Sequence, residues 1–407
     1  MRMCTRRGRA PCTLTVALVI AGLLVGRAVV PPAHAAEAAS APATAQLRGE
    51  LTALEAGGER VALLHLWGSP YDMGYAHGAL CREQVRALYE HLVGAVQEFG
   101  VTLEMVDAAW AQMAPHVPQR YLDEMRGLAD GAGVDLQTVQ RAHAVPDLSE
   151  FHCTFFAAWS AATADGHLHQ IRALDYEMNA GIQQFPALIV CEPEGRNAFV
   201  NVGWLGFIGC VSGMNAEHIA LSEIGEHFGD EGETLAGTPM PFLMRRVLED
   251  ADSLDEALAI FEAAERTSSY LYCVGDAKLP GARALRTSHD FCEAWAPEDF
   301  GELALPEVVA WSMGQDSAWN RRVHDVLAPL VGTIDERTGM EAVMRGLGTG
   351  NLHAVHYDVT DLELWVANAT PGPDAEPAYT RPFVHFDLAV FLETAARATH
   401  EARPAAP

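Results

Sequence analysis

Positive charge is scarce in this sequence. The 407 residues include 27 Lys and Arg against 54 Asp and Glu, which gives a formal net charge of −27, and Lys278 is the only lysine. An acidic surface repels phosphate backbones and anionic lipid head groups. We therefore expect neither nucleic acid nor an anionic membrane as a partner.

Long apolar runs are scarce as well. The run from Leu14 to Val25 is too short to span a bilayer and is soon followed by Arg27. It stands after an arginine-rich start and before Ala33-His34-Ala35, the order of charge, apolar core and small residues that is typical of a secretory signal. We predict a signal peptide over residues 1–35, no membrane span, and a secreted or periplasmic protein.

Paired cysteines are missing. Eight cysteines occur, and none belongs to a Cys-x-x-Cys pair, so zinc sites and thioredoxin-type chemistry have no support. Two histidine pairs, His167/His169 and His353/His356, are interpreted as surface histidines without a third nearby ligand. We therefore predict no metal and no cofactor. Because export permits disulfides, each cysteine is also a candidate disulfide partner or small buried residue.

Apolar periodicity predicts a mixed chain of helices and strands. Residues 60–67 indicate a strand, and Ser69 then caps a helix whose apolar stripe runs to Gly100. Gly74 and Gly78 lie inside this helix, where each costs about 1 kcal/mol relative to alanine, so we expect another backbone to pack against them. Further helices are expected at 103–114 and 119–129, an antiparallel meander of strands between 187 and 224, and alternating helices and strands from there to residue 367.

A predicted β-hairpin in the middle of the chain carries the reactive side chains. Residues 153–159 (CTFFAAW) form its first strand, Asp165 and Gly166 its turn, and residues 167–176 its second strand. Because the two strands pair antiparallel, a cation and an anion near the end of the second strand return toward the cysteine that opens the first.

Cys153 is the candidate nucleophile. A thiol with a pKa of about 8.5 is only slightly ionised at neutral pH and needs a base. Cleavage of the bond between His152 and Cys153 would supply one, because the freed α-amine has a pKa of about 8. Asp175 would then hold the ammonium group. Arg172 would favour the thiolate and orient Asp175, and the Asn215 amide would donate to the oxyanion.

Three motifs, in this order, carry a family resemblance: His152-Cys153-Thr154-Phe155, Arg172-Ala173-Leu174-Asp175-Tyr176 and Ser212-Gly213-Met214-Asn215. Together with residues 68–78 and the segment 351–367, they resemble the autoproteolytic acyltransferases of the isopenicillin N (6-aminopenicillanic acid) acyltransferase type. More distantly, they look like penicillin V and bile-salt amidases and acid ceramidase. The set spans roughly residues 60 to 390. Each motif alone is weak, and their occurrence together in this order is what makes the resemblance specific.

This resemblance implies an α+β protein with the four-layer αββα sandwich of the N-terminal-nucleophile (Ntn) hydrolases. It also implies self-cleavage before Cys153. The chain would then consist of a linker over 36–46, an N-terminal helical pro-region or α-chain over 47–152, a catalytic β-chain over 153–393, and a disordered tail over 394–407. The two chains would stay associated. The implied substrate is a small N-acyl amide, whose acyl group passes to the thiol and then to water, to an amine acceptor, or in exchange with acyl-CoA.

Two positions depart from the family pattern. Ala173 stands where the family usually has asparagine, which keeps the two neighbouring charges and loses one amide. A later Asn-His pair appears here as Ser288-His289. The resemblance therefore assigns Ser288 to the catalytic site as a donor with a shorter reach.

Each candidate also has a structural alternative. These are a disulfide of Cys153 with Cys191 or Cys210, a surface ion pair between Arg172 and Asp175, a turn at Asn215, and a solvated strand hydroxyl at Ser288. Two functional alternatives remain open with them. One is a non-catalytic secreted binding protein on the same fold, and the other is a lipid or ester acyl hydrolase on a related Ntn scaffold.

Overall fold

The computed structural model describes residues 47–401 except 99, 149–152, 177, 179–180, 227–232, 314–316 and 373. Several predictions therefore lie outside the described residues: the signal peptide over 1–35, the linker over 36–46, His152 at the predicted cleavage site, and residues 402–407 of the predicted tail. Within the described part of the chain, no helix is both long and apolar enough to cross a membrane.

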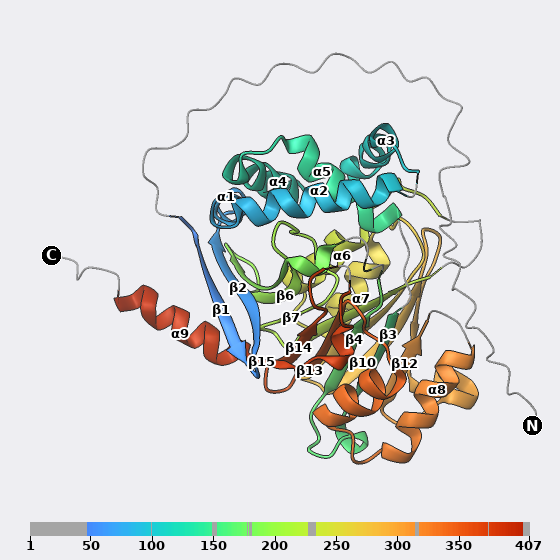
Figure 1. Cartoon of the computed structure of the whole chain (residues 1–407). Helices are drawn as coiled ribbons and strands as arrows, with labels where there is room; N and C mark the ends of the chain where they lie inside the picture. Colours follow the sequence, from blue (N-terminus) through green and yellow to red (C-terminus); the bar gives the residue numbers. More distant parts are fainter. Residues whose placement is uncertain are drawn as a thin grey trace, which may run out of the picture.

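Two β-sheets form the centre of the molecule (Figure 1). The larger sheet has the strand order β1 (Gly49–Ala56), β2 (Glu59–Gly68), β5 (Pro186–Pro193), β6 (Phe199–Trp204), β7 (Gly213–Asn215), β8 (Ile219–Gly225), β9 (Tyr270–Asp276), β10 (Gly281–Thr287) and β11 (Cys292–Trp295). The smaller sheet has the order β12 (Val308–Ser312), β3 (Cys153–Ala158), β4 (His169–Leu174), β13 (His353–Asp358), β14 (Glu363–Asn368) and β15 (Val384–Asp387). Most neighbouring strands pair antiparallel, whereas β2 and β5 are parallel.

Helices pack on both sheets, which gives four layers. The larger sheet carries α6 (Met240–Asp250) and α7 (Leu254–Ala263), and the smaller sheet carries α8 (Ser317–Leu327) and a π-helical segment (Thr338–Arg345). The two sheets contact each other through β3, β4 and β8, and their facing side chains form the main core. This arrangement is a four-layer αββα sandwich, so the predicted α+β architecture is confirmed.

The segment before residue 149 contributes strands as well as helices. Its β1 and β2 extend the larger sheet, and β2 pairs with β5 from Ala62 opposite Ala187 to Gly68 opposite Pro193. Its α-helices are α1 (Pro70–Leu80), α2 (Arg82–Glu98), α3 (Leu103–Met113), α4 (Gln119–Ala132) and α5 (Leu136–Ala144), which form a group over one end of the sandwich (Figure 1). The predicted helical pro-region is therefore also part of the sheet.

Two helices, α1 and α2, occur where the apolar stripe predicts one. The helix breaks at Cys81, where φ is −119° and ψ is 27°. A Cβ added to Gly74 would lie 2.0 Å from the carbonyl oxygen of Glu124, and one added to Gly78 would lie 2.4 Å from that of Leu128. The backbone of α4 thus packs against both glycines, as expected. The break keeps α1 on α4 while α2 turns to pack on α5.

The strands β3 and β4 form the predicted hairpin. They pair antiparallel, with Cys153 opposite Leu174 and Ala158 opposite His169. Gly166 in the connecting turn has a φ of +83°, in the region that favours glycine. The end of β4 therefore returns to the start of β3, and the predicted proximity of the two segments is confirmed.

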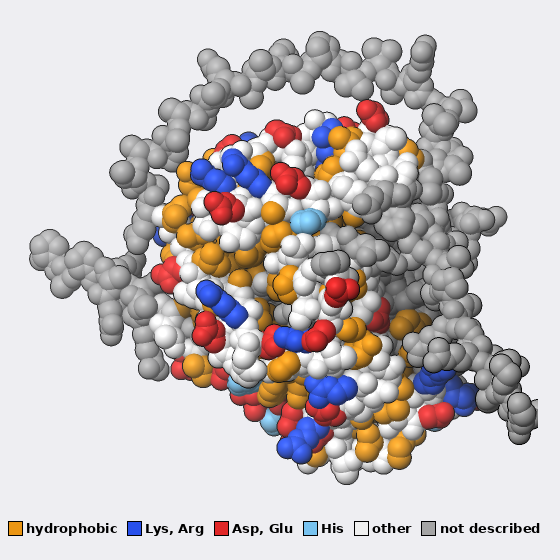
Figure 2. Space-filling view, in the orientation of Figure 1, with side chains coloured by type: hydrophobic (Ala, Val, Ile, Leu, Met, Phe, Trp, Pro, Cys, Tyr) orange, Lys and Arg blue, Asp and Glu red, His pale blue; other side chains and the backbone are white. Residues whose placement is uncertain are grey.

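The C-terminal helix α9 runs from Leu388 to Glu401. Residues 394–401 are therefore helical, although the sequence assigns them to a disordered tail. On the face shown in Figure 2, acidic, basic and apolar side chains are interspersed over the described surface.

Candidate active site

Cys153 begins β3 at an apolar pocket. The residue is 1% exposed, and the pocket contains about 680 Å³ of empty space, part of it open to solvent. The lining includes Leu88 and Leu92 from α2, and Trp204 and Phe207 from β6 and the loop that follows it. Both sides of the predicted cleavage site thus build the pocket, and its walls suit an apolar group.

An ion pair joins Arg172 of β4 to Glu223 of β8 across the two sheets. The two side chains are 0% and 5% exposed. Arg172 also donates to the backbone carbonyls of Val211 at 3.3 Å and Ala173 at 3.0 Å, and its guanidinium interacts with the Cys153 thiol. Arg172 is therefore a buried cation beside the candidate nucleophile. The alternative of a surface ion pair between Arg172 and Asp175 is wrong.

Asp175 lies just beyond β4 and is held by a loop that precedes β13. Its Oδ2 accepts a hydrogen bond from the Thr349 hydroxyl at 2.6 Å, and its Oδ1 accepts from the backbone N–H groups of Gly350 and Asn351, both at 2.9 Å. The loop thus orients Asp175. The prediction is that Arg172 orients Asp175, but the ion pair of the guanidinium is with Glu223 on the opposite sheet, and its effect on Asp175 is to lower the pKa of that carboxyl.

A chain of hydroxyl groups connects this loop to the strand of the nucleophile. Thr349 Oγ1 lies 2.9 Å from Thr154 Oγ1, which lies 2.7 Å from Ser312 Oγ. All three residues are 0% exposed. Because Thr154 follows Cys153 directly, the network ties the position of the thiol to that of Asp175.

Burial dominates the electrostatics of Cys153. It raises the pKa of the thiol to about 12, while Arg172 lowers this pKa and Glu223 and Asp175 raise it. Burial also raises the pKa of Asp175, and the hydrogen bonds from its loop oppose that shift. In the uncut chain the thiol is therefore protonated at neutral pH, and it reacts only if a nearby group accepts its proton.

Asn215 ends β7, and its amide is committed to backbone groups. Its Nδ2 donates to the carbonyls of Leu248 at 3.0 Å and Ala251 at 2.9 Å, and its Oδ1 accepts from the N–H groups of Glu217 at 3.0 Å and Ile219 at 2.9 Å. Both amide hydrogens are used. The predicted oxyanion donor is therefore wrong. Asn215 stands at a turn, as the alternative has it, but without the positive φ that the alternative allows.

Ser288 follows β10 at the turn to β11. It is 2% exposed, its hydroxyl accepts from the Asp290 N–H at 3.1 Å, and its carbonyl accepts from Arg266 Nε at 2.8 Å. It is not one of the residues that line the pocket of Cys153. The structure therefore gives Ser288 a turn role in place of the predicted catalytic one, and the solvated alternative is wrong too.

The disulfide alternative for Cys153 requires Cys191 or Cys210 as its partner. Both are buried free thiols in the described structure. Cys210 donates a hydrogen bond to the carbonyl of Ser212 at 3.3 Å. These two residues therefore behave as small buried side chains.

Two buried histidines of the N-terminal part hold the loop that carries Phe207. The Gly206 N–H donates to His77 Nε2 at 2.7 Å, and the Ile208 N–H donates to His143 Nε2 at 3.0 Å. The His143 ring also stacks on Phe207, with centroids 4.7 Å apart. Burial lowers the pKa of His77 to about 3 and that of His143 to about 4, so both rings are neutral acceptors at neutral pH.

Sequence reasoning misses Glu223 and Thr349. Glu223 lies in the strand IALSEIG, and a carboxylate in a buried strand signals that a cation must face it, although not which cation. Thr349 is 174 residues from Asp175 in the chain, so only the fold shows their contact.

Comparisons with known proteins give partial matches, and a scan against models of protein families finds none. The chain is 29% identical over 381 residues to Protein dcd1B of Dictyostelium discoideum, covering 81% of this chain and 74% of that protein. It is 23% identical over 185 residues to the N-acylethanolamine-hydrolyzing acid amidase of Mus musculus, covering 42% and 48%. The solved structure of a Caenorhabditis elegans ortholog of that amidase matches with a TM-score of 0.39 and 13% identity, covering 58% of this chain and 100% of the other.

Proposed function

We propose that this chain is an exported cysteine amidohydrolase of the Ntn type, activated by self-cleavage before Cys153. The observation that carries the proposal is the position of this thiol, at the start of a strand, in an apolar pocket and beside a buried guanidinium. A mouse relative named for hydrolysing N-acylethanolamines supports an amide as the substrate. The arginine-rich, apolar start of the sequence supports export.

Self-cleavage begins at the thiol of Cys153. Its sulfur attacks the carbonyl carbon of residue 152 while the thiol proton passes to the amide nitrogen of Cys153, so the C–N bond breaks and Cys153 leaves with a free amine. Water then hydrolyses the thioester and releases the new carboxyl end. The products are two chains, one of which begins with a free α-amine and a free thiol on the same residue.

The freed amine supplies the base that the thiol needs. With a pKa of about 8, it accepts the thiol proton, and the sulfur attacks the acyl carbon of the substrate. The ammonium then protonates the departing amine, and water releases the acyl group from the thioester. Burial, which raises the pKa of the thiol to about 12, makes an internal base necessary.

Arg172 and Asp175 have separate roles in this proposal. The guanidinium of Arg172 stabilises the thiolate, since it lowers the pKa of the Cys153 thiol. Asp175, fixed by the loop before β13, holds the ammonium of the new N-terminus. The Glu223 carboxylate balances the buried guanidinium and keeps it in place.

The pocket favours an apolar acyl group. Leu88, Leu92, Trp204 and Phe207 line it, and the charged Glu223 in the lining is already paired with Arg172. Since two of these residues precede the cleavage site, the α-chain must stay bound. The pairing of β2 with β5 provides such a link between the chains. Amines and the thiol of coenzyme A are the acceptor classes that the thioester would react with when water does not, and coenzyme A would leave as acyl-CoA.

Mass spectrometry of the purified protein tests the first step. We expect a fragment that begins at Cys153 from the wild-type chain and a single uncut chain from Cys153→Ala. An intact wild-type chain after prolonged incubation would overturn the proposal of self-cleavage.

A substrate panel tests the second step on the processed protein. We expect turnover of N-acyl amides with long apolar acyl groups, and release of hydroxamates when hydroxylamine competes with water. Turnover of esters in place of amides would support the lipid acyl hydrolase, and no turnover despite cleavage would support the secreted binding protein. Cys153→Ala is the control for background hydrolysis.

A further inference from the structure

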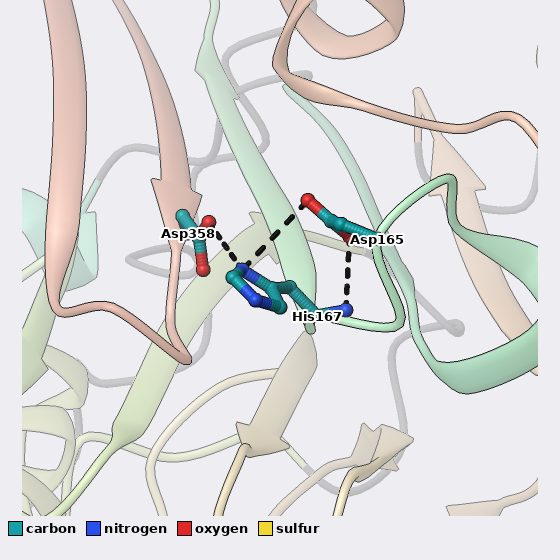
Figure 3. Close-up of side chains that lie close together, drawn as sticks. All are labelled: Asp165, His167 and Asp358. Atoms are coloured by element: carbon teal, nitrogen blue, oxygen red, sulfur yellow. Dashed lines mark hydrogen bonds and ion pairs between the residues drawn. The ribbon is translucent and has the colours of Figure 1, made fainter.

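A cluster of ligand-type side chains lies where the β3–β4 hairpin turn meets the end of β13. Figure 3 shows His167 with its imidazole between the carboxylates of Asp165 and Asp358. His167 Nδ1 lies 2.9 Å from Asp358 Oδ2 and 3.7 Å from Asp165 Oδ2. A third carboxylate, that of Asp361, has its Oδ2 3.9 Å from the same nitrogen. Three carboxylates therefore converge on one imidazole nitrogen.

The negative charge of this cluster exceeds the positive charge that faces it. The ion pairs of its three aspartates are made with His167 and, for Asp165, also with His169 at 3.2 Å. An imidazole carries at most one positive charge. Three carboxylates face two imidazoles, so the cluster keeps a net negative charge in any protonation state of the rings.

The two turns that supply these side chains are joined by their own hydrogen bonds. The Leu168 N–H donates to the Thr360 hydroxyl at 2.9 Å, and the Val359 N–H donates to the Leu168 carbonyl at 2.9 Å. Asp358 Oδ1 accepts from the N–H groups of Thr360 and Asp361, which fixes its carboxylate. The cluster is thus positioned by the backbone.

A buried pair of imidazoles supports the cluster from inside the sheet. His169 and His356 are 1% and 0% exposed, and His169 Nδ1 lies 3.0 Å from His356 Nε2. The other nitrogen of His169 is 3.2 Å from Asp165 Oδ2. Hydrogen bonds from buried groups to a ligating carboxylate are typical of the outer shell of a metal site, which orients the ligands.

We propose that Asp165, His167, Asp358 and Asp361 bind a divalent transition-metal ion such as Zn²⁺ or Mn²⁺. One imidazole nitrogen with carboxylate oxygens is a ligand set that suits these ions better than the all-oxygen ions Ca²⁺ and Mg²⁺. Ligand atoms about 2.1 Å from an ion lie about 3 Å from one another. The 2.9 Å separation already fits, and the ligand atoms of Asp165, His167 and Asp358 all lie within 4.8 Å of one another, so a bound ion would draw the carboxylates inward.

The site is distinct from the pocket of Cys153. Cys153 pairs with Leu174 at one end of the hairpin, whereas Ala158 pairs with His169 at the end beside the cluster. The two ends are five residue steps apart along the strand, which is about 17 Å at about 3.3 Å per residue. The ion would therefore join the β3–β4 turn to the β13–β14 turn and take no part in the reaction at the thiol.

Burial corrects the interpretation of the two histidine pairs as surface residues, because His169, His353 and His356 are at most 1% exposed. Of the pair His167/His169, the first has carboxylates as neighbours from a turn 191 residues away, and the second is buried. His353 lies elsewhere, where its Nε2 is 2.8 Å from Ser212 Oγ. The sequence could not reveal the site because Asp358, which ends β13, lies 191 residues from His167 in the chain, and Asp361 follows it.

Metal titration of the untagged full chain tests the proposal. The Cys153→Ala protein is stripped with EDTA, exchanged into chelator-free buffer at pH 8, and titrated with ZnCl₂ or MnCl₂ by calorimetry, with the melting temperature measured in parallel. We expect one equivalent to bind and the melting temperature to rise. The uncut variant makes the result independent of the proposed catalytic function.

Three variants separate this site from other histidines. Asp165→Asn and Asp361→Asn change side chains that are 40% and 58% exposed, so both proteins should fold, and each should weaken binding about 10- to 100-fold. The matched control is His385→Ala, which removes an exposed histidine that faces the single carboxylate of Glu363 at 3.1 Å. Absence of binding to the parent chain, or equal binding by all variants, would overturn the proposal.

Discussion

Arg172 and Glu223 form a buried ion pair that joins the two sheets beside Cys153. The cation lowers the pKa of the thiol, and the carboxylate raises it. The pair therefore acts on the nucleophile with opposite signs while it holds β4 against β8. Because two charges can remain buried only as partners, the loss of either should be costly.

Glu223→Gln leaves the guanidinium of Arg172 buried without a counter-charge. We expect the free energy of unfolding to fall by about 3–5 kcal/mol, measured by urea denaturation of the uncut Cys153→Ala chain. The double variant Glu223→Gln/Arg172→Met removes the uncompensated charge and should regain most of this loss. The control is Glu217→Gln, which breaks the exposed pair with Lys278 and should cost at most about 1 kcal/mol. Equal losses at the two glutamates would contradict the buried role of Glu223.

The contact between α1 and α4 depends on glycine. A Cβ at Gly74 would lie 2.0 Å from a backbone oxygen of α4, and a helix backbone cannot move aside as a side chain can. We expect Gly74→Ala to lower the free energy of unfolding by about 1–3 kcal/mol or more, although alanine favours a helix.

The matched control for this substitution is Gly94→Ala in α2. A Cβ there meets no atom within 4 Å, so the helical preference of alanine should raise the free energy of unfolding by about 0.5–1 kcal/mol. Thermal or urea unfolding of both variants gives the comparison. A stabilising effect at both positions would show that α1 and α4 are farther apart than described.

Local patterns predict most of the elements around the site. The Asp-Gly turn and the apolar runs on either side predict the β3–β4 hairpin, and the two glycines of α1 predict a close backbone contact. These inferences hold because each depends on residues near one another in the chain. The break at Cys81 is missed because the apolar stripe continues through it, and only the packing of α2 on α5 requires the turn.

Partners of the site residues are harder to predict. Arg172 and Asp175 are three residues apart and of opposite charge, so an ion pair between them is the natural interpretation. In the fold, Arg172 faces the other sheet, and Asp175 lies beyond the end of β4. Asn215 has the chemistry of an oxyanion donor, and only its four backbone hydrogen bonds show that both amide hydrogens are used.

The stability of the fold should fall in acid because of its buried neutral histidines. The pKa of His77 is lowered to about 3 in the fold, against about 6.5 when unfolded. Between these values His77 is protonated in the unfolded chain and neutral in the fold. The free energy of unfolding is therefore highest above pH 6.5 as far as this group is concerned, and it falls as the pH drops toward 3. For one such group the loss is about 1.4 kcal/mol per pH unit.

Other buried groups modify this dependence. The pKa of His143 is lowered to about 4, which adds to the loss, whereas the pKa of Asp147 is raised to about 6, which opposes it. We expect melting temperatures of the uncut chain to decrease from pH 7 to pH 4.5. His77→Gln should decrease less, because glutamine does not titrate in this range, and its side-chain oxygen can still accept from Gly206. His385→Gln, at an exposed ring, should keep the parent slope. A parent chain with no such decrease would contradict the neutral state of these rings.

Thr349 provides a test of the role of Asp175. Its hydroxyl donates to Oδ2 of Asp175 at 2.6 Å and lowers the pKa of that carboxyl, which burial raises. Thr349→Val keeps the size of the side chain and removes the donor. Because Asp175 must be ionised to hold the ammonium of Cys153 in the proposed mechanism, the acid limb of the kcat/KM profile should move to higher pH. A hydrogen bond to a charged group is worth about 1.5–3 kcal/mol, so activity on the acid side should fall about tenfold or more.

The comparison uses processed enzyme, with cleavage confirmed by mass spectrometry. Thr349→Ser retains a hydroxyl and should keep the acid limb of the wild type, which separates the loss of the donor from a change in packing. An unchanged limb in processed Thr349→Val would show that some group other than Asp175 must be ionised for activity. A uniform loss of kcat at all pH values would instead mean that the hydroxyl chain through Thr154 positions the thiol, because a geometric defect does not depend on protonation.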